Sequence, residues 1–328
     1  MQVNRPDEPA YAGGATFQKL PLALDASELE GADVAILGAP MDDLVSNRPG
    51  TRFGPRAIRL AWDGGGPPEA YNIDLGVDPF AELTVVDHGD ASVVPGNAAA
   101  SHRGIHEAVT RIVAAGAVPI VLGGDHSIAY PDISAVAANY GAGELTVVQF
   151  DTHADTATEI WGVKYSHGSP FRHLVDENIL QGDRLIQIGL RGHWPLPEEF
   201  DWMRSKGVRW HRMQEIADGG IHSVVGRVLE EIPDDTRLFL SVDVDALDPA
   251  FAPGTGTPEP GGMTSRELLG AVRSLVLARG LAGMEVVEVS PPYDPTNITA
   301  TVAHRVVLEA LSAFALHRGS RSPSPEDP

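Results

Sequence analysis

A series of short apolar segments, rich in β-branched residues, recurs along the chain and limits the folds that it can adopt. Each is nearly continuous in apolar residues, which is typical of strands buried on both faces of a parallel sheet. Residues 265–278 and 299–317 instead place their apolar side chains on one face at helical spacing. This alternation predicts an α/β fold, in which helices cover both faces of a mostly parallel sheet. The predicted strands are 33–38, 84–87, 118–122, 145–151, 184–189, 237–243 and 284–289.

The domain organisation is expected to be simple. No segment is long or polar enough to divide the chain, so we expect one catalytic domain over residues 31–318. Residues 1–30, rich in Pro and Gly, are expected to wrap the surface or to reach a neighbouring subunit. Residues 319–328 are expected to be a disordered tail.

Charge and cysteine content exclude several kinds of site. The 328 residues include 24 Lys+Arg and 45 Asp+Glu, for a formal net charge of −21. Such a chain lacks the basic surface that binding to nucleic acid or to an anionic membrane requires. It has no Cys, which excludes a thiol nucleophile and a cysteine-based zinc site. Neither a signal peptide nor a membrane span is recognisable, so we expect a soluble cytoplasmic protein.

Acidic and histidine residues are concentrated after three of the predicted strands. They lie in the segments 123–126 (GGDH), 150–155 (FDTHAD) and 241–245 (SVDVD). Carboxylates crowded at one edge of a sheet are unstable unless cations neutralise them. Together the three segments predict divalent metal, with two ions. Mixed imidazole and carboxylate ligands suit Mn(II), and also Ni(II), Zn(II), Co(II) or Fe(II).

Each segment taken alone also has a structural interpretation. An acid at the end of a strand often caps the helix that follows, and Asp125 could cap a helix that begins near Ser127. The joint occurrence of the three segments favours the metal site.

These segments resemble the motifs of the ureohydrolases, the arginase–agmatinase superfamily of binuclear manganese enzymes. The resemblance covers roughly residues 33–316, with every motif in the family's order, and implies the single-domain, three-layer αβα arginase-like fold. The motifs are RPGTRFGPRAIR (48–59), GGDHS (123–127), DTHAD (151–155), YSHGSPFRH (165–173), SVDVDALDPAFAPGTGTPEPGG (241–262) and VVEVSPPYD (286–294).

The resemblance implies two metal ions per subunit, Mn²⁺ or alternatively Ni²⁺. Asp151 and Asp243 would bind both ions. His126 and Asp155 would complete one site, and His153 and Asp245 would complete the other. The full ligand set would be His126, Asp151, His153, Asp155, Asp243 and Asp245.

The implied reaction is the hydrolysis of a guanidino compound to urea and an amine. A guanidinium is a delocalised cation and a poor electrophile, so its hydrolysis needs a strong nucleophile. Two metal ions can lower the pKa of a shared water enough to supply hydroxide at neutral pH. By resemblance, Asp155 would relay a proton to the leaving nitrogen and Glu288 would hold the guanidinium. His167 would bind substrate and exchange protons with solvent.

The loop 155–167 favours the agmatinase-like branch of the family. Ala157 stands where arginases use an Asn to bind the α-amino acid end of arginine, which argues against L-arginine. We expect the small cationic substrate agmatine, cleaved to putrescine and urea, and we expect Trp161 to bind it. Hydrolysis of guanidinobutyrate, guanidinopropionate or proclavaminate, or nickel-dependent hydrolysis of guanidine, are the alternatives. An acidic substrate would need a nearby cation, for which Lys164 and Arg172 are candidates.

Two more distant alternatives are a single-zinc deacetylase of related fold and a non-catalytic subunit. The number of Asp ligands argues against the first, and the retention of every ligand argues against the second. The resemblance also implies a homo-oligomer, a trimer or a hexamer. The segment 41–43 (MDD) departs from the aromatic-Asp-Gly common in the branch and could reshape the pocket. Trp194 is expected to pack within the fold.

Overall fold

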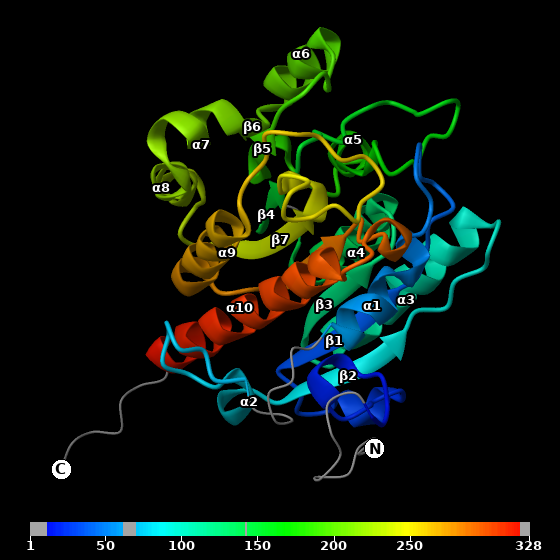
Figure 1. Cartoon of the computed structure of the whole chain (residues 1–328), viewed down its shortest axis with the longest axis vertical. Coiled ribbons are helices and arrows are strands. Elements are labelled where there is room, and N and C mark those ends of the chain that lie inside the picture. Colours follow the sequence, from blue (N-terminus) through cyan, green and yellow to red (C-terminus); the bar gives the residue numbers. More distant parts are fainter. Residues whose placement is uncertain (1–11, 62–69, 142, 322–328) are drawn as a thin grey trace.

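A parallel eight-stranded sheet forms the centre of the protein in the computed structural model, which describes residues 12–61, 70–141 and 143–321 (Figure 1). The strand order is β2-β1-β3-β8-β7-β4-β5-β6, and every pairing between these strands is parallel. The strands are β1 (Val34–Ala39), β2 (Val85–Asp90), β3 (Val118–Gly123), β4 (Leu145–Phe150), β5 (Leu185–Leu190), β6 (Arg209–Arg212), β7 (Arg237–Asp243) and β8 (Gly283–Val287).

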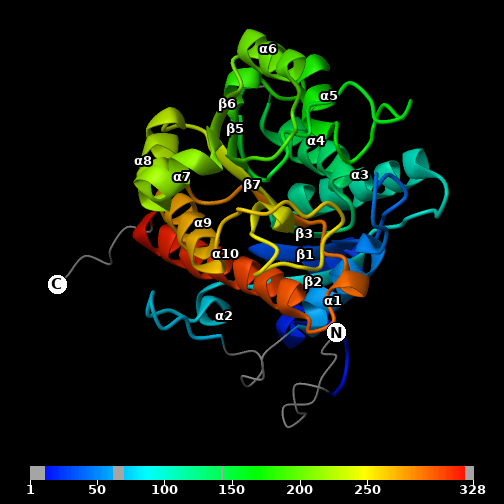
Figure 2. The same ribbon diagram turned by 45° about the horizontal axis from the view of Figure 1, so that its top comes forward.

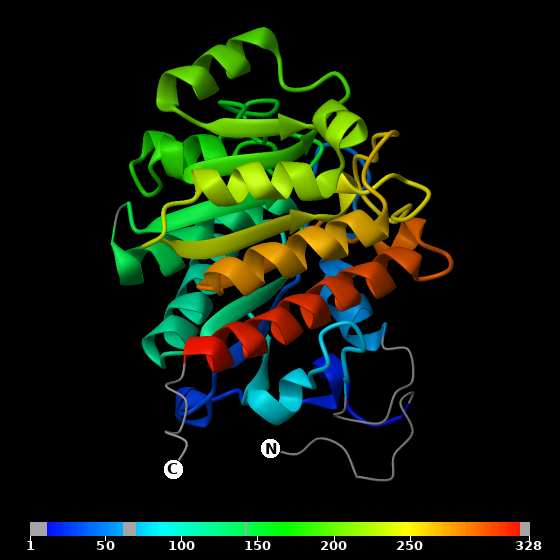
Figure 3. The ribbon, with the colours of Figure 1, turned by 90° about the vertical axis from the view of Figure 1, so that its left-hand side faces the viewer.

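Helices cover both faces of this sheet (Figure 2). One apolar core packs α1, α7, α8, α9 and α10 against one face, and a second core packs α3, α4, α5 and α6 against the other. Figure 3 looks onto the first of these layers. The helices are α1 (Gly54–Leu60), α2 (Pro79–Glu82), α3 (Ala98–Ala114), α4 (Ala129–Tyr140), α5 (Pro170–Asp176), α6 (Pro197–Lys206), α7 (Met213–Gly219), α8 (Ile221–Glu231), α9 (Ser265–Arg279) and α10 (Ile298–Arg321).

The predicted three-layer α/β fold is thus confirmed, and each predicted strand overlaps an observed one. Strand β6 was not predicted. Its sequence is RWHR, and it lies at the edge of the sheet, where it pairs with β5 alone. An edge strand needs no continuous apolar run, because one of its sides is not covered by a neighbouring strand.

The described ends of the chain add detail to what was expected. Phe17 is fully buried and stacks on His304 with 4.3 Å between ring centroids, and its N–H donates to the Asp87 carboxylate. Phe17 therefore anchors the described part of the N-terminal segment to the core, while residues 24–28 lie exposed on the surface. Helix α10 continues to Arg321, so the first residues of the expected tail are helical. Residues 1–11 and 322–328 lie outside the described residues.

Within the described ranges, α10 is the one helix that is long and apolar enough to cross a membrane by length and composition. Most of its apolar stretch is buried in the protein, where it packs into the same core as α9. Its apolar character is therefore explained by its place in the fold, as expected of a core helix.

The strand order explains where the site forms. Strands β3, β8, β7 and β4 are consecutive neighbours in the sheet, although they are far apart in the sequence. Because they are parallel, their carboxyl ends meet at the same edge, which is where open α/β sheets bind ligands. That edge brings His126, Glu288, Asp243 and Asp151 together, since each ends one of these strands or follows it closely.

Candidate metal centre

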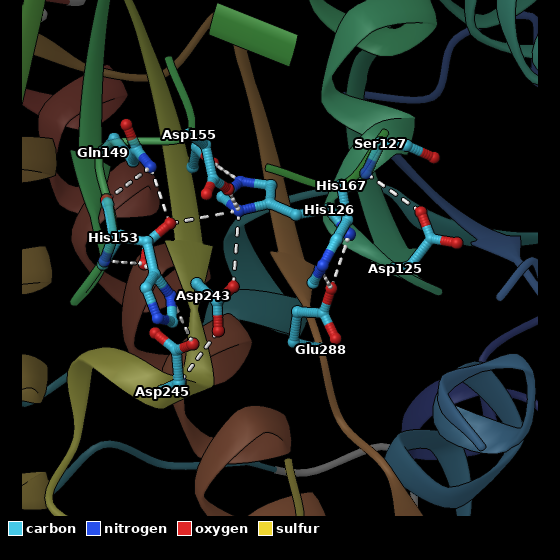
Figure 4. A network of polar contacts seen from close by, with 12 residues as sticks. Asp125, His126, Ser127, Gln149, His153, Asp155, His167, Asp243, Asp245 and Glu288 are labelled. Carbon is cyan, nitrogen blue, oxygen red and sulfur yellow. Dashed lines mark hydrogen bonds and ion pairs between the residues drawn. The ribbon is translucent and has the colours of Figure 1, made fainter. Parts of the chain in front are cut away.

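The first cluster of predicted ligands surrounds the His126 imidazole (Figure 4). Its Nδ1 lies 2.8 Å from Oδ2 of Asp155 and 3.2 Å from Oδ2 of Asp151. The same nitrogen lies 3.3 Å from Oδ2 of Asp243. One imidazole nitrogen thus faces oxygen atoms of three carboxylates, as expected for residues that share one cation.

The second cluster surrounds His153. Its Nδ1 lies 3.1 Å from Oδ2 of Asp245 and 3.5 Å from Oδ1 of Asp151. Asp151 therefore turns one oxygen toward each histidine, which fits a carboxylate between two ions. Asp243 turns Oδ2 toward His126, and its Oδ1 accepts a hydrogen bond from the Asp245 N–H.

The electrostatics of these clusters favour a cation. Burial and the neighbouring Asp245 and Asp151 raise the pKa of Asp243 well above its usual value. Burial raises the pKa of Asp245 to about 6, and Asp151 adds to the effect. Burial and Asp151 likewise raise the pKa of Asp155. Each shift means that a negative charge is unfavourable at that position, and a bound divalent ion would remove the conflict.

The hydrogen bonding of His126 provides a direct test of whether these residues fit a metal ion. Its Nε2 lies 2.8 Å from the Ser241 hydroxyl, which can accept the ring N–H. The buried Nδ1 faces three carboxylates but forms no hydrogen bond of good geometry within the described part of the chain. Although burial opposes it, Asp151, Asp155 and Asp243 raise the pKa of His126, so this point favours a positive charge, either a proton or a metal ion. The residues present therefore fit a metal ion.

The backbone at three predicted site residues is left-handed. Asp155 has φ 51°, Trp161 has φ 50° and Glu288 has φ 63°, a region that non-glycine residues rarely adopt. Such backbone strain clusters at functional sites, where the surrounding structure maintains it.

Asp125 has the structural role that the sequence left open. Its carboxylate accepts hydrogen bonds from the N–H groups of Ser127, at 3.0 Å, and Leu44, at 3.1 Å. It thereby caps the short 3-10 helix His126–Ile128 and fixes the direction in which His126 points.

Glu288 and His167 form a pair beside the His126 cluster (Figure 4). Oε1 of Glu288 lies 3.0 Å from Nδ1 of His167 and accepts the N–H of His126 at 2.9 Å. Although burial opposes it, Glu288 raises the pKa of His167, which favours a proton on Nδ1. Nε2 of His167 faces the Ser46 hydroxyl at 2.8 Å. Oε2 of Glu288 is buried and has no hydrogen-bond partner among the described residues.

A cavity of about 420 Å³ opens over this edge of the sheet. His153, Asp155 and His167 line it, whereas Glu288 does not and lies behind His167. Trp161 also lines it and is 83% exposed. The other lining residues are Ser46, Ala154, Glu159, Ile160, Gly168, Trp194, Pro195, Glu199 and Thr257.

One sequence-based expectation about the pocket, the packing role of Trp194, needs correction, and the structure decides the roles of two cations that the sequence left open. Trp194 lines the cavity instead of packing within the fold. Lys164 does not line it and pairs with Glu177 at 2.9 Å. Arg172 pairs with Asp176 at 2.6 Å and stacks on an indole ring. The cations proposed for binding an acidic substrate are therefore engaged elsewhere.

The segment 41–43 shapes the pocket indirectly. Asp42 accepts the Gly50 N–H at 2.8 Å and pairs with Arg52. Asp43 accepts the Gly96 N–H at 2.9 Å and also pairs with Arg52. These bonds hold the loop that presents Ser46 to His167, so both carboxylates act on the loop's conformation.

Known proteins of similar sequence and structure cover almost the whole chain. A family model, "Arginase family", matches residues 32–313. A guanidinobutyrase of Pseudomonas aeruginosa is 38% identical, with 92% of this chain and 93% of that protein covered. A mitochondrial agmatinase of Gallus gallus is 39% identical, with 91% and 85% covered. The solved proclavaminate amidino hydrolase of Streptomyces clavuligerus has a TM-score of 0.86 at 37% identity, covering 94% of this chain and 100% of that one.

Proposed function

The chain belongs to the arginase family and is a hydrolase of guanidino compounds, and we propose that its substrate is agmatine, released as putrescine and urea. One observation carries the choice of substrate. Among the described residues that line the cavity there is no Lys or Arg, whereas Glu159 and Glu199 are present. A guanidino acid would bring its carboxylate toward these acids, while agmatine would bring an ammonium group.

Glu199 is the acid best placed for this role. It is largely buried in α6, and Thr156 donates a hydrogen bond to its Oε2 at 3.3 Å. Its Oε1 accepts the Leu196 N–H at 3.4 Å. These bonds fix the carboxylate on the cavity wall, where a carboxylate on the substrate would meet repulsion in a partly desolvated setting.

The same proposal includes two metal ions and the residues that would bind them. The residues that would hold them are His126, Asp151, His153, Asp155, Asp243 and Asp245. We propose Mn²⁺, with Ni²⁺ as the alternative. When bound, two divalent ions lower the pKa of a water molecule enough for it to act as the nucleophile at neutral pH.

The side chains around the ions supply the remaining chemistry. Asp155 lines the cavity beside His126 and would pass one proton of the nucleophilic water to the departing nitrogen. His167 reaches from Glu288 to the cavity and would carry the other released proton of that water to solvent. Glu288 does not line the cavity, so a guanidinium would have to reach past His167 to bond to its free Oε2.

The proposal also covers the oligomeric state and the cellular location of the enzyme. We propose a homo-oligomer, a trimer or hexamer, located in the cytoplasm. The Gallus gallus relative is named mitochondrial, so location varies within the family.

A substrate panel tests the choice of agmatine. Urea release from agmatine, 4-guanidinobutyrate, 3-guanidinopropionate, proclavaminate and guanidine is measured with Mn²⁺ and separately with Ni²⁺. We expect the kcat/KM for agmatine to exceed that for each guanidino acid at least about tenfold, which corresponds to about 1.4 kcal/mol. A higher kcat/KM for a guanidino acid or for guanidine would refute agmatine while leaving the reaction class intact.

Replacing Trp161 by alanine tests its proposed contact with substrate. An exposed indole on the cavity wall can cover the alkyl chain and attract a cation, interactions made equally in the ground and transition states. We therefore expect Trp161→Ala to raise the KM for agmatine by about 3- to 10-fold with little change in kcat. Trp202→Ala is the control, because Trp202 lies outside the cavity and donates to Asp176. An unchanged KM in Trp161→Ala would exclude the contact.

A further inference from the structure

A row of buried polar side chains crosses the sheet directly beneath the candidate metal ligands. Gln149 of β4 pairs in register with Gln187 of β5 on one side and with Ser241 of β7 on the other. Ser241 in turn pairs with Glu285 of β8. All four are fully buried. Polar groups in the centre of a sheet are costly unless they are hydrogen-bonded, so their partners indicate what the row does.

The amide of Gln149 donates to the segment that carries the candidate ligands (Figure 4). Its Nε2 lies 2.6 Å from Oδ2 of Asp151. The same nitrogen lies 3.5 Å from the carbonyl oxygen of His153. One side chain thus contacts both the carboxylate expected between the two ions and the backbone of the next ligand.

Gln187 extends this arrangement from the neighbouring strand. Its Nε2 donates to Oε1 of Gln149 at 2.5 Å and to the carbonyl oxygen of Ala154 at 2.6 Å. The two amides therefore hold the segment 151–154 at three points, one of them a side chain and two of them backbone carbonyls. Asp155, with its left-handed backbone, follows immediately.

The direction of these hydrogen bonds follows from chemistry. An ionised carboxylate can only accept, so Gln149 must turn its NH₂ toward Asp151 and its oxygen toward Gln187. Gln187 must then donate to that oxygen, and its second N–H meets the Ala154 carbonyl. Each amide has one orientation that satisfies its neighbours, at the cost of leaving Oε1 of Gln187 buried without a partner among the described residues, so the two glutamines form a fixed set of donors aimed at the ligand segment.

We infer that Gln149 and Gln187 are positioning residues for metal binding, which orient Asp151 and the segment 151–155 before an ion arrives. The inference rests on the proposed function, because it needs the two clusters to bind metal. A carboxylate that is already oriented loses less conformational freedom when it coordinates an ion, so the ion binds more tightly. None of the four residues of this row is among the described residues that line the cavity, so we expect substrate binding not to depend on them.

Replacing Gln149 by methionine tests the inference, because methionine keeps the length and volume of the side chain and removes both N–H donors. We expect the dissociation constant for Mn²⁺ to rise about 10- to 100-fold. Calorimetric titration of the metal-free protein measures the loss of Mn²⁺ affinity, and elemental analysis after dialysis measures the metal that stays bound. We further expect excess Mn²⁺ to restore kcat, with the KM for substrate changed less than about twofold.

Thr146→Val is the matched control. Thr146 lies on the same strand, is equally buried and bonds to Thr236 at 2.8 Å, but its side chain points to the opposite face. The control should lower the melting temperature without weakening Mn²⁺ binding. If Gln149→Met does not fold, Gln187→Met tests the same inference. We expect that variant to bind Mn²⁺ more weakly than the wild type does.

Two outcomes separate this inference from the proposed function. A wild-type protein that binds no divalent metal would overturn the proposed function, and the inference with it. A wild-type protein that binds two ions per subunit, and a folded Gln149→Met variant with the same affinity, would overturn the inference alone.

Discussion

Replacing Asp243 by asparagine is expected to abolish urea release and to reduce the bound metal. Asp243 ends β7 with Oδ2 facing the His126 imidazole, in a fully buried position beside Asp245 and Asp151. An amide keeps the volume but removes the charge that would bind both ions. We expect kcat/KM to fall by at least about 10³-fold, because the loss of one shared ligand affects both ions. Elemental analysis should find fewer than two ions per subunit.

The same variant is also expected to change the thermal stability of the metal-free protein. In the metal-free protein the Asp243 carboxylate faces other carboxylates, and its negative charge is unfavourable. The melting temperature of metal-free Asp243→Asn should therefore equal or exceed that of the metal-free wild type. Added Mn²⁺ should raise the melting temperature of the wild type more than that of the variant. Differential scanning calorimetry with and without Mn²⁺ measures both.

Asp248→Asn is the control from the same segment of chain. Its Oδ1 accepts the N–H of Ala250 at 2.9 Å and its Oδ2 accepts the N–H of Gly261 at 2.7 Å, so an amide keeps one of these bonds and lowers local stability without touching the metal ligands. We expect this variant to retain both ions and full activity. Full activity and metal content in Asp243→Asn would contradict the assignment of Asp243 as a ligand.

The fold could be predicted from the sequence wherever the chain is buried on both sides. Central strands such as β4 and β7 are mostly apolar and almost wholly buried, so the pattern predicts them directly. The edge strand β6 could not be predicted, because its polar RWHR sequence is stabilised by pairing with β5 alone. The core role of Phe17 was also missed, since its partner His304 is remote in sequence.

The candidate site was predictable only where its residues follow each other at strand ends. The Asp and His residues of 151–155 and 243–245 are visible as local patterns, and the structure brings them together. Gln149 and Gln187 carry no such signal, because their roles come from the register between β4 and β5. Glu199 was missed for a similar reason, since the position of α6, which carries it, is decided by tertiary packing. The proposed choice of substrate depends on Glu199, which lines the cavity, and not on the two glutamines.

Replacing Glu288 by glutamine is expected to separate substrate binding from metal binding. Oε1 of Glu288 is already engaged by His126 and His167, and Oε2 is buried and unbonded within the described residues. A guanidinium that reaches past His167 would meet this free oxygen, which does not itself line the cavity, and a glutamine would oppose it with an N–H group or a weaker, uncharged acceptor. We expect kcat/KM to fall about 10²- to 10³-fold while two metal ions per subunit remain bound.

The protonation of His167 provides an independent readout of the same change. Because the Glu288 carboxylate raises the pKa of His167, its replacement by an amide should lower that pKa, which an NMR titration of the imidazole measures. Glu309→Gln is the control, because Glu309 is equally buried but pairs with Arg273 on α9. That control should lose stability and keep its activity and the pKa of His167. A Glu288→Gln variant with wild-type kcat/KM would show that the guanidinium is held by other groups, and one that lost its metal would assign Glu288 to the metal centre itself.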